Sequence, residues 1–589
     1  MSSSNPNPIT ARSDPAFTTL TSNPDVRARP FSTVEKLLYH FKTVTAPLTK
    51  EHLSIYSALK LSFPSSVADP IPHIRTAWAA TVKHHPQLGS VLNLRNQTDD
   101  SGKTPNILIP TYDAAEWLAK TFTIDHKATS ATALFESAKD EEYATCIWIP
   151  LSSQVLFQTS HWRMDGGSLM TIAVNFLHVL SQSLSKGADA ALDNFTSPVG
   201  DGSLAPNVDW ILDTFPDEAS TPDYIVKAAD TMYTDMLAGA PSVALPPREG
   251  SDEAIPGDST RVTINFGKET TSQLLAGSKA KGITISLATH AAIIRCSARY
   301  PQHPLCKSYG RFAPVDIRKD FPSPYNTPQY SIGEYCAAFP VIVLDVVSEN
   351  KTFGQVCEEL QKSYQRARNS GFKDDAGQPV ATADVGASFI RRILDLVNTA
   401  PPPDMPSVQA VDFASMGLVE KVLSPFDFAE TGDTVCSEMP HDPEAQTLRA
   451  DFLSIVAMIL YHQGVSGCQR DGQIILNVVE IRWKALESIS REEWTELDTV
   501  SFARAHADLD YVVCESNDGD KADTLFQIYI GIYTHIKNTN RRALVLSKKV
   551  LISSASQQVS KTRNKEHLAA IKIESLLDPD NPLIFLIKH

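Results

Sequence analysis

The chain has 589 residues, of which 42% are hydrophobic and 21% are charged, and its formal net charge is −15. These proportions are typical of a globular protein, and the length exceeds what one ordinary hydrophobic core accommodates, so we expect two or more subdomains. The acidic balance argues against a nucleic-acid-binding surface, where Lys and Arg dominate.

Three further features of the whole sequence exclude other classes of protein. The N-terminal segment 1–27 is polar and proline-rich and contains no apolar signal region, which predicts a loose leader. The apolar run "FLSIVAMILY" is about half the length of a transmembrane helix, so we expect no membrane span. The eight cysteines are scattered without a C-x-x-C pair. Their spacing favours reduced thiols in a cytoplasmic protein without a metal site.

The first part of the chain predicts alternating helices and strands. A capping box of Ser32 and Glu35 begins the helix "STVEKLLYHF", and the strand "HLSIYSALKLSF" follows it. The helix "DPIPHIRTAWAATVKHHPQLGSVL" stops before Pro86. Two strands in "EYATCIWIPLSSQVLFQTSH" are joined by a Pro-Leu-Ser-Ser turn, and the second ends at His161. Apolar residues at helical spacing then predict a helix from about Ser168.

A segment rich in Pro, Gly and Asp, 182–258, predicts a crossover linker to a second α/β pattern. That pattern contains the strand "TRVTINF", a helix around 270–282, the helix "SLATHAAIIRCSARY", the strands "GRFAPVDIRKDF" and "YCAAFPVIVLDV", the helix "KTFGQVCEELQKSYQRARNSG" and the strand "DFASMGLVEKVL". Beyond about residue 500 the composition favours a solvated or partly disordered extension.

The stretch "VLFQTSHWRMDGGSLMTIAVNFL" contains the main candidates for catalytic residues. An alternating strand stops at His161, the chain turns through Asp165, Gly166 and Gly167, and an amphipathic helix begins. In "HADLDY", His506 and the aspartate four residues later share the spacing but lack the glycine, the preceding strand and the helix. We interpret that second pair as surface residues, because the context and not the spacing distinguishes His161.

A histidine at the end of a strand is placed for general-base catalysis, because its unperturbed pKa lies near neutral pH. The adjacent glycines permit a bend that aims Asp165 away from the ring and into an ion pair. The chain has no G-x-S-x-G elbow, so this base predicts direct attack by a substrate hydroxyl without a covalent enzyme intermediate. The residues leave one alternative open, in which His161 bonds a neighbouring carbonyl and Asp165 caps the next helix.

At residues 161–166 the sequence "HWRMDG" resembles the H-x-x-x-D-G signature of the superfamily of chloramphenicol acetyltransferase, plant BAHD acyltransferases and peptide-synthetase condensation domains. Other segments resemble the family in matching order, namely "RPFSTVEKLLYHF", "IRTAWAATVKHHPQLGSVL", "ITISLATHAAI", "FAPVDIRKDF…YSIGEYC" and "FASMGLVEKVL". The resemblance covers roughly residues 28–490. Within the superfamily, the sequence is most similar to fungal trichothecene O-acetyltransferase-type enzymes.

The resemblance implies an α/β fold of two similar chloramphenicol-acetyltransferase-like subdomains, each a mixed sheet flanked by helices, with the active-site channel between them. The boundaries we expect are a leader at 1–27, an N-terminal subdomain carrying the motif at 28–181, the crossover region at 182–258, a C-terminal subdomain at 259–495 and an unassigned extension at 496–589.

Carried onto this sequence, the resemblance implies roles for five residues. His161 is the general base that removes the proton of the acceptor, and Asp165 is a structural carboxylate whose expected partner is Arg318 of "VDIR". Gly166 is the small residue that lets backbone donors approach the reaction centre. Ser415 of "ASMG" is a candidate oxyanion hydroxyl, with strand packing as the alternative. Arg318 and Ser415 are also the candidates for contact with the acyl donor.

The implied function is an acyl-CoA-dependent O-acyltransferase, with acetyl-CoA the expected co-substrate and no permanently bound cofactor. The expected acceptor is a hydroxyl of a hydrophobic secondary metabolite such as a terpenoid or polyketide, and the expected oligomeric state is a monomer. The plant motif D-F-G-W-G is absent, and Ser160 stands where condensation domains usually carry a second histidine. Two alternatives stay open: a condensation-type enzyme that uses a carrier-bound donor or forms an amide, and a non-catalytic relative that binds a small molecule.

Overall fold

A computed structural model describes residues 16–46, 50–197, 204–245, 256–368, 370–399, 410–419, 448–457, 464–470 and 473–483. All of them belong to one compact unit. The extension predicted at 496–589 lies outside the described residues.

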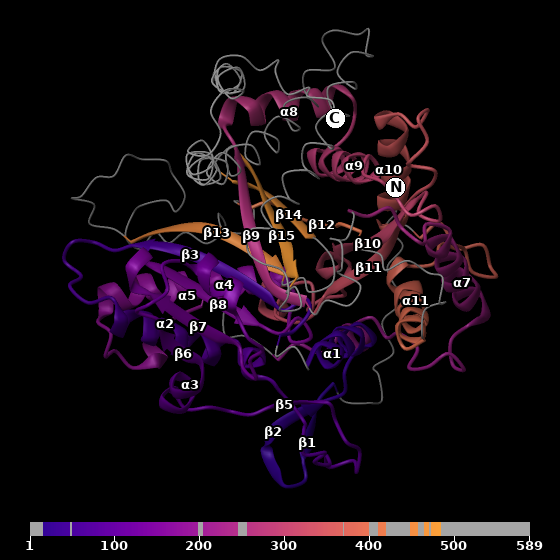
Figure 1. The fold of residues 1–589 in the computed structure, drawn as a ribbon. Helices are drawn as coiled ribbons and strands as arrows, with labels where there is room; N and C mark the ends of the chain where they lie inside the picture. The colour runs from indigo at the N-terminus through magenta and orange to yellow at the C-terminus, as the bar shows by residue number, and fades with distance from the viewer. Residues whose placement is uncertain are drawn as a thin grey trace, which may run out of the picture. The chain divides into compact units, whose positions relative to one another are not determined.

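Helices and strands alternate along the chain (Figure 1). The α-helices are α1 (Thr33–Thr45), α2 (Ile71–His84), α3 (Ala114–Thr121), α4 (Ala131–Ser137), α5 (Gly166–Lys186), α6 (Val208–Ile211), α7 (Asp223–Ala238), α8 (Lys268–Ala280), α9 (Ile285–Ala298), α10 (Phe353–Arg368) and α11 (Thr382–Val397). The strands are β1 (Thr18–Leu20), β2 (Asn23–Arg29), β3 (Ile55–Ser62), β4 (Val91–Leu92), β5 (Ile107–Ile109), β6 (Phe122–Ile124), β7 (Thr145–Ile149), β8 (Gln154–Thr159), β9 (Pro256–Phe266), β10 (Tyr309–Asp316), β11 (Cys336–Val343), β12 (Asp412–Leu418), β13 (Arg449–Ala457), β14 (Gly464–Arg470) and β15 (Gln473–Trp483).

Two larger mixed sheets organise the fold. The five-stranded sheet has the order β13-β3-β8-β7-β6, and the four-stranded sheet has the order β12-β14-β15-β9. Strands β6 and β7 are parallel, as are β12 and β14. Strand β13 lies in the second half of the chain yet pairs antiparallel with β3, so a late segment completes the first sheet. The mixed α/β fold with two subdomains expected from the sequence is confirmed.

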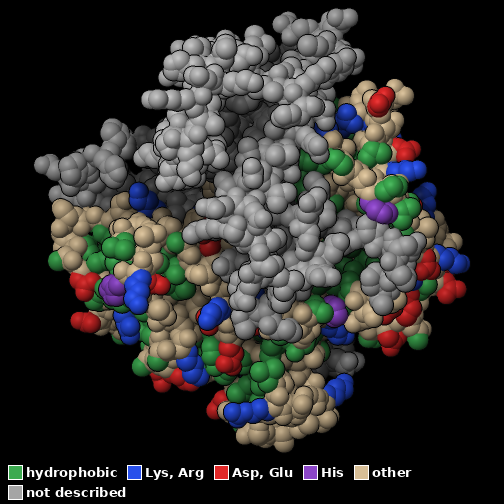
Figure 2. All heavy atoms as spheres, viewed as in Figure 1, with side chains coloured by type: hydrophobic (Ala, Val, Ile, Leu, Met, Phe, Trp, Pro, Cys, Tyr) green, Lys and Arg blue, Asp and Glu red, His purple; other side chains and the backbone are tan. Residues whose placement is uncertain are grey.

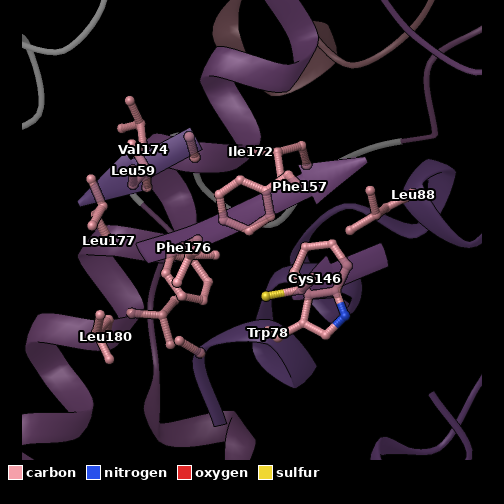
Figure 3. Packing of buried hydrophobic residues seen from close by; sticks show 14 of the residues in the cluster. Leu59, Trp78, Leu88, Cys146, Phe157, Ile172, Val174, Phe176, Leu177 and Leu180 are labelled. Carbon is pink, nitrogen blue, oxygen red and sulfur yellow. The ribbon is translucent and has the colours of Figure 1, made fainter. Parts of the chain in front are cut away.

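A core of aromatic and aliphatic side chains holds β8 against helices α2 and α5 (Figure 3). The Trp78 ring stacks between those of Trp117 and Phe157, with ring centroids 5.7 and 5.6 Å apart respectively. The Phe176 ring of α5 meets Phe157 edge-on at 5.1 Å. Because removing such a buried aromatic ring costs about 3–5 kcal/mol, this packing fixes the end of β8, two residues before His161.

The second half of the described chain is built around the antiparallel pair β10 and β11. Buried side chains of α7 and α11 pack on Phe339 of β11, and those of α9 and α10 pack on Val341 and Val343. Helix α7 ends where Gly239 meets Gly310 of β10. A Cβ on Gly239 would lie 2.8 Å from the Gly310 Cα atom, so only glycine permits this approach.

Most predicted elements are confirmed, and three points need correction. Helix α5 begins at Gly166, ahead of the predicted Ser168, and it ends at Lys186, inside the segment predicted as a linker. The same segment, 182–258, contains the helix α7, whose Ile225, Ala228, Ala229, Met232 and Met236 are buried. Their helical spacing was present in the sequence but was hidden by flanking Pro and Asp residues. Helix α11 was not predicted.

Two properties of the described residues bear on the kind of partner. Within them, no helix is long and apolar enough to cross a membrane. On the face shown in Figure 2, Lys and Arg side chains are interspersed with Asp and Glu side chains and form no continuous basic area. This distribution agrees with the net charge of −15.

Candidate active site

The loop that carries His161 connects β8 to α5 and is fixed by buried neighbours. The Arg163 guanidinium is only 2% exposed and donates to the Ser90 carbonyl at 2.9 Å, the Thr159 hydroxyl at 2.9 Å and the Glu142 carbonyl at 2.7 Å. Burial lowers the pKa of Arg163 to about 10, so the group stays charged at neutral pH. The Trp162 ring packs against Phe31. These contacts fix the shape of the turn.

Asp165 makes both contacts that the sequence left as alternatives. Its Oδ1 atom accepts from the Ser168 N–H at 2.8 Å and caps helix α5. The Arg318 guanidinium also reaches it in a bidentate pair, at 2.7 Å to Oδ1 and 2.9 Å to Oδ2. Burial opposes ionisation of Asp165, but Arg318 outweighs it and holds the pKa of that carboxyl below its usual range. The ion pair predicted between Asp165 and Arg318 is present.

Arg318 follows β10 and has all its donor groups engaged by the protein. Besides Asp165, it donates to the Ser331 carbonyl at 3.0 Å, to the Ser168 hydroxyl at 2.8 Å and to Asp316 at 3.0 Å. Gly167 leaves room for it, since a Cβ there would lie 3.2 Å from the Arg318 Nη1 atom. These contacts favour a role in the ion pair over contact with an acyl donor.

A residue that sequence analysis missed completes the site. Glu334, in the loop before β11, places its Oε2 atom 2.8 Å from the Nδ1 atom of His161. The Glu334 side chain is 1% exposed, whereas the His161 side chain is 21% exposed. In the described part of the chain, Nδ1 is the only ring nitrogen of His161 with a hydrogen-bond partner. The Nε2 atom has no such partner among the described residues.

No sequence signal marks Glu334 as a partner of His161. It belongs to "YSIGEYC", a segment that the sequence singled out only for its resemblance to a glycine loop after the Arg318 strand. The two side chains are 173 residues apart, and they meet because the second half of the chain docks on the loop after β8. Only the tertiary structure reveals the pair.

The remaining two predicted site residues lie on other elements. Gly166 is the first residue of α5 and is half-buried beside the His161 loop. Ser415 is exposed on β12, where its hydroxyl lies 2.8 Å from that of Ser286 in α9. The roles assigned to Gly166 and Ser415 stay predictions.

Asp165, Glu334 and Cys336 bring oxygen and sulfur atoms within 4.8 Å of one another, which is an arrangement that metal sites also use. Arg318 and His161 already pair with the two carboxylates. Burial raises the pKa of the Cys336 thiol well above its usual range, which opposes the thiolate that a metal requires. The donor set therefore fits an ion-pair network better than a metal centre.

The arrangement provides the parts of general-base catalysis. A carboxylate fixes one nitrogen of His161, the His161 side chain is partly exposed, and a second carboxylate anchors the loop through Arg318. Such a base removes a proton from a hydroxyl that is held within hydrogen-bond reach of the free nitrogen.

Comparisons with known proteins agree with this fold. No family model matches the chain. It is 25% identical over 410 residues to the O-acetyltransferase pigM of Monascus ruber, covering 68% of this chain and 73% of pigM. The structure of TRI3 trichothecene 15-O-acetyltransferase from Fusarium sporotrichioides matches with a TM-score of 0.56 at 16% identity, over 84% of this chain and 99% of that one. The chain therefore shares the fold of TRI3 and is similar in sequence to pigM.

A further relative carries a name of another kind. The chain is 27% identical over 406 residues to the loline biosynthesis cluster 1 transcription factor lolU1 of Epichloe uncinata, covering 67% of this chain and 80% of that protein. The name describes lolU1. The chain described here carries interspersed charges on the face shown in Figure 2 and a net charge of −15.

Proposed function

We propose that the protein transfers an acyl group, acetyl foremost, from acyl-CoA to a hydroxyl of a hydrophobic secondary metabolite. The observation that carries this proposal is the His161 ring, with Nδ1 held by Glu334 and Nε2 left for a substrate. The names of pigM and TRI3, both O-acetyltransferases, support oxygen as the acceptor atom.

In the proposed reaction, His161 Nε2 takes the proton of the acceptor hydroxyl as its oxygen attacks the thioester carbonyl. A tetrahedral oxyanion forms, the carbon–sulfur bond breaks, and the imidazolium returns the proton to the leaving thiolate. One ester and one free thiol result, and the protein is unchanged. No acyl-enzyme intermediate is needed, because the acceptor itself is the nucleophile.

Asp165 and Arg318 act in this reaction without touching the reacting atoms. Their ion pair joins the loop after β8 to the segment after β10, so it holds the two halves of the described site in register. Breaking one partner of a buried pair leaves the other uncompensated, at a cost of about 3–5 kcal/mol. We therefore assign Asp165 and Arg318 to the structure of the site.

The experiment measures thiol release from a panel of acyl-CoAs with a mixed set of terpenoid and polyketide alcohols. We expect acceptor-dependent release by the wild type and its loss in His161→Ala. His126→Ala is the matched control, since His126 is an exposed histidine distant in sequence, and it should retain the wild-type rate. Equal background release by all three proteins would overturn the acyl-CoA proposal. A test with a carrier-bound donor would then address the condensation-type alternative.

A further inference from the structure

The segment 331–335, between β10 and β11, presents Glu334 to His161. The carboxylate lies in a buried position, with Oε2 2.8 Å from His161 Nδ1 and Oε1 accepting from the Cys336 N–H at 3.3 Å. Both oxygens therefore have a partner inside the protein. Glu334 does not touch the free Nε2 atom of His161, so it acts on the ring and not on a substrate.

The residues on either side of Glu334 are bonded to the motif loop and to the first turn of α5. The Gly333 N–H donates to the Ser168 hydroxyl at 3.0 Å, and the Ser168 hydroxyl donates to the Gly333 carbonyl at 2.7 Å. On the other side, the Tyr335 N–H donates to Asp165 Oδ2 at 3.0 Å. The Asp165 carboxylate that pairs with Arg318 thus also holds the backbone beside Glu334.

Gly333 is required for this approach. A Cβ at this position would lie 2.5 Å from Cζ of the buried Tyr335 ring, and the Tyr335 hydroxyl is held by the Pro206 carbonyl at 2.7 Å. The ring has no room to move away. The backbone of the segment is therefore fixed on both sides of Glu334, and this restricts the position of the carboxylate.

We propose that Glu334 is a positioning residue that sets the tautomer and the basicity of His161, and that Asp165, Arg318 and Ser168 serve to place it. The proposal rests on the function proposed above for His161. It extends the role of Asp165 from anchoring a loop to aligning a second carboxylate.

The physical reason is the polarity of the hydrogen bond. An ionised carboxylate only accepts, so His161 Nδ1 carries the hydrogen and in the neutral ring the lone pair is at Nε2, where the acceptor hydroxyl must lose its proton. When Nε2 takes that proton, the imidazolium is stabilised by the carboxylate 2.8 Å away. Other charged or titratable groups nearby are Asp165, which is already paired with Arg318, and Cys336.

The same contacts predict the pH range in which the base is free. Burial lowers the pKa of His161, but Glu334 outweighs burial and raises it to about 9. Burial raises the pKa of Glu334 to about 7, against the attraction of His161. Between about pH 7 and 9 the two groups form an ion pair with Nε2 protonated, and above that range Nε2 becomes free. The acid limb of kcat/KM is therefore expected near pH 9.

The test follows the titration of His161 in the full-length protein by two routes. One is the pH dependence of kcat/KM. The other is the rate at which diethyl pyrocarbonate, which acylates only the unprotonated ring, modifies His161, measured by peptide mass spectrometry. The second route needs no turnover, so failure of the proposed function and failure of this inference give different results.

In the wild type, we expect the midpoint of the His161 titration near pH 9. In Glu334→Gln we expect that midpoint at or below pH 6.5, because burial then lowers the pKa of the ring without a compensating carboxylate. Glu334→Asp retains the charge and should restore part of the shift. Glu35→Gln is the matched control, since Glu35 is equally buried but pairs with Arg29, and it should leave the midpoint unchanged.

Two results would overturn the proposal. One is a wild-type midpoint at or below 6.5, which needs no variant and so does not depend on how Glu334→Gln folds. The other is a midpoint in Glu334→Gln that equals the wild-type value. Loss of kcat in Glu334→Gln with an unmoved midpoint would show a structural role alone, and it would also contradict the proposal.

Discussion

Two histidines in different halves of the chain occupy contrasting surroundings. His161 donates through Nδ1 to a buried carboxylate and keeps Nε2 for other contacts. His290, in helix α9, is fully buried, with Nδ1 2.9 Å from the Tyr364 hydroxyl and Nε2 2.9 Å from the Tyr309 hydroxyl. Burial raises the pKa of Tyr309 well above its usual range, so these partners stay uncharged at neutral pH.

The difference teaches that the partner, and not burial, decides what a buried histidine does. Burial lowers the pKa of both rings. It lowers that of His290 to about 3, because the phenols offer no charge that stabilises imidazolium. Beside His161 the Glu334 carboxylate outweighs burial and raises the pKa to about 9. The first ring has a free nitrogen and can move a proton, whereas the second serves as a bridge between two tyrosines.

The largest expected effect is that substitution of His161 lowers kcat, whereas substitution of His290 lowers stability. His161→Phe should lower kcat of the folded protein by about 10²–10⁴-fold, which is the usual worth of a general base. His290→Phe should leave kcat of the folded protein nearly unchanged and destabilise it, since two hydroxyls lose a partner at about 1–3 kcal/mol each. Thiol release and urea unfolding measure the two quantities. Equal loss of kcat in both folded variants would contradict the distinction.

The next effect concerns the carboxylate that holds the surroundings of His161. Asp165→Ala should lower the free energy of unfolding by about 3–5 kcal/mol, because it leaves the Arg318 charge uncompensated, and it should lower kcat as well. Asp113→Ala is the matched control, since Asp113 caps α3 with a single bond to the Glu116 N–H at 2.7 Å and has no such charge to balance.

The control should cost about 1 kcal/mol and leave kcat unchanged. Urea unfolding followed by circular dichroism compares the two aspartates. If Asp165→Ala left both the unfolding midpoint and the turnover intact, the ion pair would have no role in the site.

The contrast between the histidines also shows what the sequence could predict. His161, Asp165 and their turn follow from local order, since an alternating strand, two glycines and an amphipathic helix are all readable from the sequence. Arg318 followed from a resemblance to a family motif. The structure contains the ion pair that this resemblance implied.

Glu334 could not be predicted in the same way. A glutamate in a polar loop is ordinarily solvated, and its burial depends on Ser168 and Asp165 docking the neighbouring backbone. The role of His290 was equally hidden, because a histidine among alanines in "SLATHAAI" gives no sign of two tyrosines 19 and 74 residues away. Helix α7 was missed for a different reason, since its apolar spacing lies within a segment of linker-like composition.

A smaller effect distinguishes the histidines through stability against pH. His290 binds no proton in the native state down to about pH 3, whereas the unfolded chain protonates it below about 6.5. Native stability therefore includes a contribution that is present above pH 6.5 and is lost as the pH falls, at about 1.4 kcal/mol for each pH unit.

Between pH 7 and pH 5 that contribution should fall by about 2 kcal/mol in the wild type and not at all in His290→Phe. Urea unfolding at the two pH values measures the difference between the proteins, in which the titration of all other groups cancels. Parallel pH profiles would show that His290 is protonated in the native state. Its partners would then be arranged differently from those described.

The smallest expected effect is at Ser415, the candidate oxyanion hydroxyl. It lies on the strand that also carries Phe413, whose ring is 5.1 Å from that of His290, and its own hydroxyl contacts Ser286. Exposed strand substitutions usually change stability by about 0.5 kcal/mol or less. If Ser415 only packs on β12, Ser415→Ala should leave kcat nearly unchanged. An oxyanion donor is worth about 10²–10³-fold in kcat. A loss of kcat of that size, with the pH midpoint of the His161 titration unchanged, would show that Ser415 takes part in the reaction at His161. It would contradict a role in strand packing alone.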